Sequence, residues 1–312
     1  MIPKYQENCK RLLEKHLKHR KTNEHLIEAF PSRVRPRVLQ CGSYVGLSPL
    51  PYNPELPHVV AGNYCRERLC AVCGWRRSVR WRAQMRPVIA ELEQHYRLIK
   101  LELTIRNCAP EDLSATIDIL FEGWKKLRRM KAWKQFAVGG EIRALECSYN
   151  QNEDTYHPHF HICVAADKEY SPQLKGYLSH SELIEMWRIA CGVDYNPSVR
   201  IQSARNLVDT VKYALKPYSA KIDDREKAVE VLQVLGTGLH GRRLITATGE
   251  IQRLRGNYSF EEGGLTDGAP TPQTAYEITY WEIDPTGGLY TFVKRVSLTE
   301  KRREEYDNRT GY

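Results

Sequence analysis

The chain has 312 residues, of which 41% are hydrophobic and 27% charged, so it is long and apolar enough to build a globular core without disulfide bridges. No apolar run approaches the roughly 20 residues of a membrane span, and the charged N-terminus lacks the hydrophobic stretch of a secretory signal. We therefore expect neither membrane insertion nor secretion. Lys and Arg number 47 against 38 for Asp and Glu, a net charge of +9 that favours a polyanionic partner, with nucleic acid the first candidate and anionic lipid the second.

The N-terminal third predicts a helix, a loop region and a second helix. Residues 1–30 have the composition of a polar helix. Residues 31–64 contain six prolines and little periodicity, which predicts a loop-rich segment wrapped around a metal. Residues 75–96 predict an arginine-rich helix, with Pro87 as a kink or break.

Four of the nine cysteines have the spacing of a metal site. An odd number of cysteines without an export signal favours reduced thiols or metal ligands over disulfides. Cys70 and Cys73 form a CxxC pair, and a structural zinc ion needs four ligands, which Cys65 and Cys41 complete, with His58 as a substitute for one of them. A redox CxxC pair or inert thiols are the alternatives, although the thioredoxin-like setting of a redox pair is absent. We expect the remaining five cysteines to be ordinary buried thiols: Cys9, Cys108, Cys147, Cys163 and Cys191.

The segment that follows the cysteines, WRRSVRWRAQMR (75–86), interleaves arginine with tryptophan. Guanidinium groups suit phosphates, and tryptophan stacks on bases or on arginine. Arginine is used almost to the exclusion of lysine, which argues against a merely solvated helix face. We therefore predict DNA contacts from these side chains: Trp75, Arg76, Arg77, Arg80, Trp81 and Arg82.

The rest of the chain alternates strand and helix patterns. Strands are predicted over 97–107, 139–150, 155–166, 197–203 and 275–297. Helices are predicted over 111–136, over a capped segment that ends at Gly192, and over 205–216, which Pro217 stops. The predicted fold is α+β, an antiparallel sheet with flanking helices, preceded by the zinc-bearing arginine-rich segment. We expect a zinc-binding and DNA-contacting region over 1–96, a core domain over 97–235, and a C-terminal extension over 236–312.

The sequence HPHFH (157–161) predicts a second metal site. His159 and His161 alternate along a strand and therefore project from one face. If the hairpin turns at residues 152 and 153, paired residues have numbers that sum to 305, and Glu146 lies opposite His159. A His–His–Glu metal site follows from this register, whereas Glu141 would pair with residue 164 and is the weaker candidate. The alternative is an exposed histidine run on an edge strand.

Four blocks of the sequence together resemble a known family. The His–hydrophobic–His pattern resembles the HUH endonucleases, and the order of blocks resembles the rolling-circle replication initiators of small bacterial plasmids. The blocks are LELTIRN (101–107), HPHFHICV (157–164), VKYALK (211–216) and the upstream Cys-x4-Cys-x2-Cys-Gly-Trp-Arg-Arg-Ser. The resemblance covers about residues 41–255, and it implies that the core domain over 97–235 is an HUH endonuclease core.

The resemblance implies a catalytic tyrosine at Tyr213. On the predicted helix 205–216, Tyr213 lies opposite the apolar stripe, as an accessible nucleophile requires, although an exposed tyrosine without a role is the alternative. Lys216, one turn later, can stabilise the phenolate. Asp209 matches an acidic position that the plasmid group uses to activate water, where glutamate is more common.

The resemblance also implies the reaction and its partners. Tyr213 would nick single-stranded or hairpin plasmid origin DNA and form a 5′-phosphotyrosine link, with Mg²⁺ or Mn²⁺ held by the histidine site and Zn²⁺ by the cysteines. A host helicase and polymerase would act with it in the bacterial cytoplasm.

Three other functions compete with this interpretation. A histidine-triad nucleotide hydrolase would use His157, His159 and His161 without a metal, but Pro158 occupies an apolar position of its motif. A non-enzymatic zinc-containing DNA-binding regulator would use only residues 41–96 and leaves the histidine cluster unexplained. A transposase or relaxase would share the same site chemistry in a different biological context.

Overall fold

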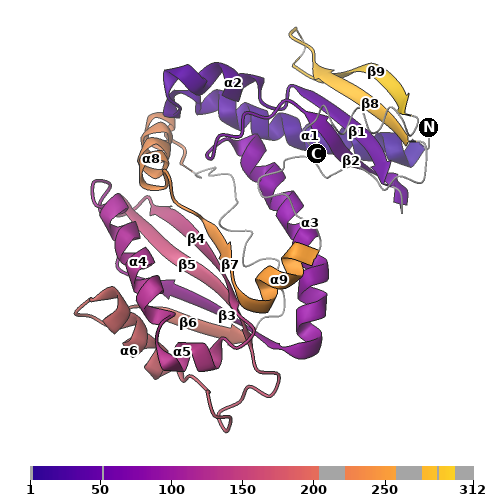
Figure 1. Ribbon diagram of the computed structural model, residues 1–312. Coiled ribbons are helices and arrows are strands. Elements are labelled where there is room, and N and C mark those ends of the chain that lie inside the picture. Colours follow the sequence, from indigo (N-terminus) through magenta and orange to yellow (C-terminus); the bar gives the residue numbers. More distant parts are fainter. Residues whose placement is uncertain (1–2, 51–52, 204–221, 258–275, 287, 299–312) are drawn as a thin grey trace. The chain divides into compact units, whose positions relative to one another are not determined.

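The computed structural model describes residues 3–50, 53–203, 222–257, 276–286 and 288–298 (Figure 1). It confirms the α+β class, because it contains two antiparallel sheets with flanking helices. The chain divides into two compact units. Unit 1 consists of Met1–Arg80, Pro217–Ser219 and Gly263–Tyr312, and unit 2 of Trp81–Lys216 and Ala220–Glu262.

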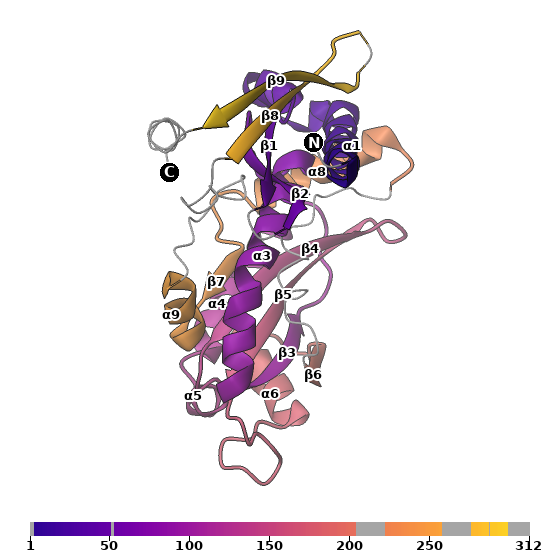
Figure 2. The same cartoon turned by 90° about the vertical axis from the view of Figure 1, so that its right-hand side faces the viewer.

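Unit 1 is built on a four-stranded antiparallel sheet in the order β2-β1-β8-β9 (Figures 1 and 2). Its strands are β1 (Tyr44–Leu50), β2 (Asn53–Gly62), β8 (Tyr276–Ile283) and β9 (Tyr290–Leu298). The helix α1 (Pro3–His25) confirms the predicted N-terminal helix. Its apolar residues pack with those of the sheet in one core cluster: Tyr5, Cys9, Leu13, Val45, Leu47 and Val59.

The prediction of a loop-rich segment over 31–64 is wrong. After two short 3-10 turns, η1 (Ile27–Ala29) and η2 (Ser32–Val34), the segment forms the helix α2 (Arg35–Gln40) and the strands β1 and β2. Its prolines are tolerated because β2 is an edge strand, where a missing backbone N–H costs little, and because the β1–β2 ladder is irregular at Pro49.

Unit 2 contains a five-stranded antiparallel sheet in the order β6-β3-β5-β4-β7. Its strands are β3 (Arg97–Thr104), β4 (Glu141–Asn150), β5 (Thr155–Ala166), β6 (Val199–Ser203) and β7 (Ile245–Ala247). The first four confirm the predicted strands, and β8 and β9 of unit 1 confirm strand structure within 275–297.

Helices cover both faces of this sheet (Figure 1). Phe160 of β5 meets Trp124 of α4 (Leu113–Leu127) and Trp187 of α6 (His180–Cys191) on one face. Cys163 and Ala165 of β5 lie in a core cluster on the other face, with the C-terminal half of α3 (Ala71–His95) and with α9 (Gly249–Asn257). The helix α8 (Arg225–Gly238) packs against α4. Successive residues of β5 therefore serve two different cores, which fixes the register of the strand.

Two predicted helices differ in detail from the observed ones, and the caps of a third are confirmed. The segment 111–136 forms two helices, α4 and α5 (Lys131–Phe136), and the break lets Trp133 turn back onto Trp124. The helix α3 begins at Ala71 and continues through Pro87. The helix α6 has the predicted caps, with Ser179 in a capping box and Gly192 in the left-handed conformation at φ 68°. Among the described helices, none combines the length and the hydropathy that a membrane span requires.

Candidate functional site

The β4–β5 hairpin has the predicted register. Glu146 pairs with His159, and Glu141 pairs with Val164. Because side chains alternate along a strand, His159 and His161 project from one face of the central strand β5, and Glu146 projects from the same face of β4. The sequence thus predicted correctly which three residues come together.

The ligand atoms of these three residues converge. His161 Nε2 lies 2.6 Å from Glu146 Oε2, His159 Nε2 lies 3.4 Å from the same oxygen, and the two Nε2 atoms are 3.1 Å apart. Both histidines are buried, with exposed fractions of 7% and 6%. The alternative of an exposed histidine run on an edge strand is therefore wrong, because β5 is the middle strand of the sheet.

A backbone contact fixes the orientation of one imidazole. His159 Nδ1 lies 3.0 Å from the carbonyl oxygen of His157 and donates to it, because a carbonyl can only accept. In the neutral imidazole, the lone pair of His159 is then on Nε2, directed at the other two ligand atoms. A contact of this kind commonly fixes the tautomer of a metal-binding histidine. Sequence reasoning assigned no role to the His157 carbonyl.

Hydrogen bonds among the three side chains favour an ionised Glu146 and a protonated His159. Burial opposes ionisation of Glu146, but hydrogen bonds with His159 and His161 outweigh it and lower the pKa of Glu146 to about 2. Burial likewise disfavours the charged form of His159, but its hydrogen bonds with Glu146 and with the His157 backbone raise its pKa. The carboxylate is therefore ionised at neutral pH, as a cation ligand must be.

The spacing of the ligand atoms fits a six-coordinate divalent cation. Two ligands about 2.1 Å from such an ion and at right angles to each other are about 3.0 Å apart. The two Nε2 atoms are separated by 3.1 Å, and Glu146 Oε2 lies 2.6 and 3.4 Å from them, so the three distances lie on both sides of this value. Two imidazoles and a carboxylate can hold Mg²⁺ or Mn²⁺, and imidazole favours the latter.

Glu141 takes no part in this cluster. It lies on the opposite face of the sheet, where its carboxylate pairs with Arg128 at 2.7 Å, and it is 4% exposed. The lower rank given to Glu141 from the register is therefore confirmed.

Four buried cysteines form a second cluster, in unit 1. The Sγ atom of Cys41 lies 3.5 Å from those of Cys70 and Cys73, and Cys65 Sγ lies 3.7 Å from Cys73 Sγ. Tetrahedral zinc with Zn–S bonds of about 2.3 Å separates its sulfur atoms by about 3.8 Å. The arrangement therefore fits zinc, with Cys41 as the fourth ligand. His58 is paired with Ser48 in the sheet and is not part of the cluster.

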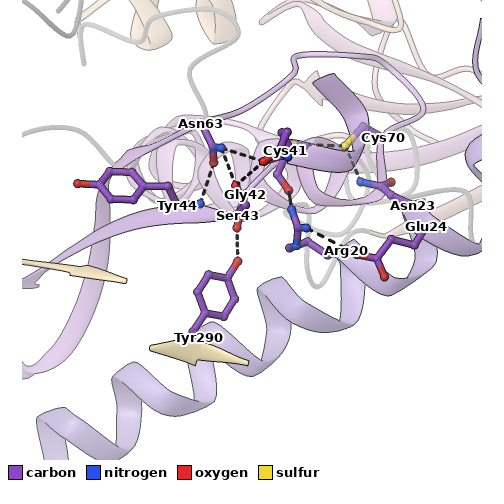
Figure 3. Close-up of polar contacts among 11 residues, drawn as sticks. Arg20, Asn23, Glu24, Cys41, Gly42, Ser43, Tyr44, Asn63, Cys70 and Tyr290 are labelled. Atoms are coloured by element: carbon purple, nitrogen blue, oxygen red, sulfur yellow. Dashed lines mark hydrogen bonds and ion pairs between the residues drawn. The ribbon is translucent and has the colours of Figure 1, made fainter. Parts of the chain in front are cut away.

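The helix α1 supplies two contacts to the cysteine cluster that sequence reasoning missed (Figure 3). Asn23 Nδ2 donates to Cys70 Sγ at 3.1 Å, while Asn23 Oδ1 accepts from the Ala71 backbone N–H at 2.8 Å. Arg20 donates to the backbone oxygen of Cys41 at 2.8 Å. Asn23 therefore satisfies a free N–H group at the start of α3 and a sulfur atom of the cysteine cluster with one side chain.

The position of Cys70 at the N-terminus of α3 favours its thiolate. Its Sγ also accepts from the backbone N–H of Cys73 at 3.5 Å, in the manner of a helix N-cap. Hydrogen bonds from the thiols of Cys41, Cys65 and Cys73 lower the pKa of Cys70. A thiolate is the form that binds zinc.

The arginine-rich helix differs from the predicted DNA-contacting face. Arg76 is only 1% exposed, so the prediction that it contacts DNA is wrong. It lies one turn after Val72 and Cys73, which face the core, and this helical spacing carries it inward. Trp75 is half-buried against His16 and His19.

The other predicted DNA contacts on α3 are only partly exposed. Arg77 donates to the backbone oxygen of Glu67 at 2.7 Å. The remaining three are half-buried: Arg80, Trp81 and Arg82. Arg255 of α9 covers the ring of Trp81 at 4.4 Å.

The three predicted catalytic residues on the tyrosine block, Asp209, Tyr213 and Lys216, lie outside the described residues. The helix predicted over 205–216 lies outside them as well. Their assignment therefore stays a prediction.

Comparison with known proteins identifies the family. The sequence model of a replication protein family, Rep_1, matches residues 57–277, which is more than half of the chain. The chain belongs to this family. The match includes both histidines, Glu146 and three of the cysteines, whereas Cys41 and α1 precede it. The resemblance to replication initiators inferred from the four blocks is confirmed at the level of this family.

Individual relatives carry corresponding names. A "Protein rep" of Streptococcus pneumoniae serotype 2 is 31% identical over 204 residues, which cover 62% of each chain. A "Protein rep" of a Bacillus species is 34% identical over 171 residues, 54% of each chain. A "Replication protein" of Staphylococcus aureus is 28% identical over 200 residues, 58% of this chain and 85% of the relative. The chain thus spans about half to two thirds of the first two relatives, and no solved structure matches it.

Proposed function

We propose that the chain initiates rolling-circle replication of a plasmid by nicking and rejoining single-stranded origin DNA. The observation that carries the proposal is the convergence of Glu146, His159 and His161 on one face of the central hairpin, inside the segment that the replication protein family matches. A histidine pair of this kind on a strand has little purpose in a protein that only binds DNA.

The metal-binding residues prepare the scissile phosphate. His159 and His161 present Nε2 lone pairs, and Glu146 adds an anionic oxygen between them. A bound Mg²⁺ or Mn²⁺ would polarise a non-bridging oxygen of the phosphate. The opposite face of β5 is fixed by Phe160, which packs edge-on against Phe121 and Trp124, so the two imidazoles are held on a rigid strand.

Tyr213 is the proposed nucleophile. The phenol loses its proton to solvent and its Oη forms a bond to phosphorus while the bond from phosphorus to the 3′ oxygen breaks. The leaving oxygen takes up a proton from solvent and becomes a 3′-hydroxyl that a polymerase can extend. A phenol has an ordinary pKa near 10, so the attack requires help at neutral pH. We assign this help to Lys216, and the activation of water in a terminating hydrolysis to Asp209.

The cysteine cluster has a structural role in this proposal. A zinc ion held by Cys41, Cys65, Cys70 and Cys73 would tie the end of α2, the segment before α3 and the first turn of α3 together. All four thiols are buried and none is left for a substrate, as in structural zinc sites. The partners of the whole protein would be hairpin origin DNA and a host helicase and polymerase in the bacterial cytoplasm.

A covalent adduct on Tyr213 tests the proposal. A labelled single-stranded origin oligonucleotide, incubated with the chain and Mn²⁺, should become attached to the protein, and peptide mapping should locate the label on Tyr213. Tyr213→Phe should abolish the adduct, whereas Tyr177→Phe, which changes an exposed tyrosine of unit 2, should retain it.

The same experiment separates the alternatives. A histidine-triad hydrolase would keep its activity in Tyr213→Phe and would need no metal. A non-enzymatic regulator would form no adduct with any divalent ion. An adduct on another tyrosine would overturn the assignment of Tyr213.

A further inference from the structure

The segments that carry the four cysteines are unusually rich in arginine. Residues 31–41 and 65–80 together contain eight arginines, no lysine and one acidic residue, Glu67. Because the four thiols meet in one buried cluster, these segments are brought together on one part of unit 1. The chain therefore concentrates positive charge around the proposed zinc site.

Several of these arginines are committed to the fold. Arg76 is buried, and Arg35 donates to the backbone oxygens of Phe30 and Glu28 at 2.8 and 3.1 Å. Arg77 donates to the backbone oxygen of Glu67. These side chains hold the segments in place and are poorly available to a ligand.

Three other arginines face solvent. Arg33, Arg37 and Arg66 are exposed, and Arg37 has a side chain that is 62% exposed and pairs with Glu67 at 2.6 Å. Within the described parts of the chain, neither Arg33 nor Arg66 pairs with an acidic side chain. The contact between Arg37 and Glu67 brings α2 beside Arg66, and Arg33 precedes Arg37 by four residues, so the three belong to one surface.

The backbone at Arg66 reinforces this interpretation. Its φ is +63°, a left-handed conformation that costs a non-glycine residue free energy and that glycine adopts without strain. With arginine instead of glycine at this exposed turn, the fold is less stable, but a guanidinium group is presented to solvent. Strained residues of this kind concentrate at functional sites.

We propose that Arg33, Arg37 and Arg66 form a surface that binds the phosphate backbone of double-stranded DNA. This inference rests on the proposed function, for which it supplies a DNA contact in unit 1 in addition to the histidine site of unit 2. Guanidinium groups pair with phosphate oxygens through two parallel hydrogen bonds, and an exposed ion pair such as Arg37–Glu67 is weak enough to exchange for them.

The composition of the surface favours duplex over single-stranded DNA. Single strands are held by aromatic side chains on which bases stack. Residues 31–41 contain no aromatic residue, and Trp75, the one aromatic residue in 65–80, is half-buried against histidine rings. Contacts to the phosphate backbone of a duplex need no aromatic side chains.

The salt dependence of duplex binding measures these contacts directly. The probe is a duplex of about 25 base pairs without origin sequence, since each phosphate contact contributes about 0.9 to the slope of log K against log salt concentration. In a Tyr213→Phe background, the triple variant Arg33→Gln, Arg37→Gln, Arg66→Gln should lower the magnitude of the slope by about 2.7. Because this background needs no nicking, the result does not depend on whether Tyr213 forms an adduct.

A matched triple variant controls for net charge. Arg129→Gln, Lys131→Gln, Lys134→Gln removes the same charge from exposed residues at α4 and α5 of unit 2. It should change the slope by less than about 1, which corresponds to one phosphate contact. Equal changes in the two triple variants would overturn the proposal, because the effect would then be one of total charge.

A variant that is expected to bind the duplex more tightly makes the test independent of folding, because a misfolded protein would bind more weakly. Glu67→Gln removes the carboxylate that competes for Arg37 and should tighten duplex binding several-fold, with zinc content unchanged. Unchanged or weaker binding would contradict the proposal. So would a triple arginine variant that keeps its slope with DNA but no longer binds phosphatidylglycerol vesicles, because the ligand of this surface would then be a membrane.

Discussion

The two ligand clusters of this molecule differ in composition, origin and accessibility. The cluster of unit 1 uses four buried thiols, and Cys41 precedes the other three in the chain by 24 to 32 residues. The cluster of unit 2 uses two imidazoles and one carboxylate from a single hairpin, and Glu146 keeps a side chain that is 18% exposed. Four soft ligands leave zinc no open position, whereas three harder ones leave a cation room for substrate oxygen. With the roles proposed above, the cluster of unit 1 would stabilise a fold, whereas the cluster of unit 2 would bind a ligand.

Loss of one thiol gives the largest expected effect. Cys70→Ser should release zinc and unfold the N-terminal unit, because metal binding free energy at such sites is folding free energy. The hairpin cluster should still bind Mn²⁺ with unchanged affinity. Metal analysis and chymotryptic digestion check both statements, with Cys191→Ser, a half-buried cysteine outside the cluster, as control. Unchanged zinc content in Cys70→Ser would rule out Cys70 as a ligand.

Loss of the carboxylate should affect binding but not folding. Glu146→Gln removes an anionic ligand and should weaken Mn²⁺ binding by about 100-fold, close to 3 kcal/mol. The unfolding midpoint should change little, since the glutamine fills the same space. Calorimetric titration with Mn²⁺ measures the affinity. Glu141→Gln, on the opposite face of β4, should leave the Mn²⁺ affinity unchanged. A large loss of affinity in this variant would show that Glu146 is not the carboxylate ligand.

The histidine site was predictable because its geometry is local. A hairpin centred between residues 152 and 153 fixes the register of both strands. Because side chains alternate between the two faces of a strand, this register places Glu146 beside His159. The burial of Arg76 follows from the same local reasoning, since it shares a helical face with Cys73, whereas the affinity of arginine for phosphate favoured an exposed side chain.

The parts that were missed depend on distant partners. The strand β1 pairs with β8 across more than 200 residues, as in Gly46 with Tyr280, and its Gly46 and Pro49 interrupt the local pattern of a strand. Asn23 and Cys70 are 47 residues apart, and a lone asparagine on a polar helix carries no sign of a sulfur contact. Local periodicity cannot report which segments tertiary packing brings together.

Acid should weaken the N-terminal unit through one buried histidine. Burial, with the nearby charge of Arg76, lowers the pKa of His16 to about 3. The unfolded chain therefore binds more protons than the folded one below about pH 6.5, and stability falls as pH decreases, by about 2 kcal/mol at pH 5. His159 in unit 2 has the opposite sign, because its raised pKa makes its contribution fully present below pH 6.5 and lost as pH rises.

Denaturant titrations between pH 5 and 7 measure this effect. His16→Gln should flatten the pH dependence of the unfolding free energy, whereas His25→Gln, at an exposed position of the same helix, should preserve it. An unchanged slope in His16→Gln would assign the acid sensitivity to another group.

The smallest expected effect tests whether α1 belongs to the cysteine cluster. Asn23→Ala removes the hydrogen bond to Cys70 Sγ and the cap of Ala71, and should speed the release of zinc to a chelator by about 10-fold, as the loss of a contact to a ligand commonly does. Asn23→Asp keeps an acceptor for the Ala71 N–H but places a negative charge beside the thiolate, so release should be at least as fast. Asn8→Ala, which removes a bond from the same helix to the backbone of Glu55, should release zinc at the original rate. If Asn23→Ala also releases zinc at the original rate, the four sulfur atoms alone determine how tightly zinc is held, and contacts from α1 do not contribute to the difference between the two clusters.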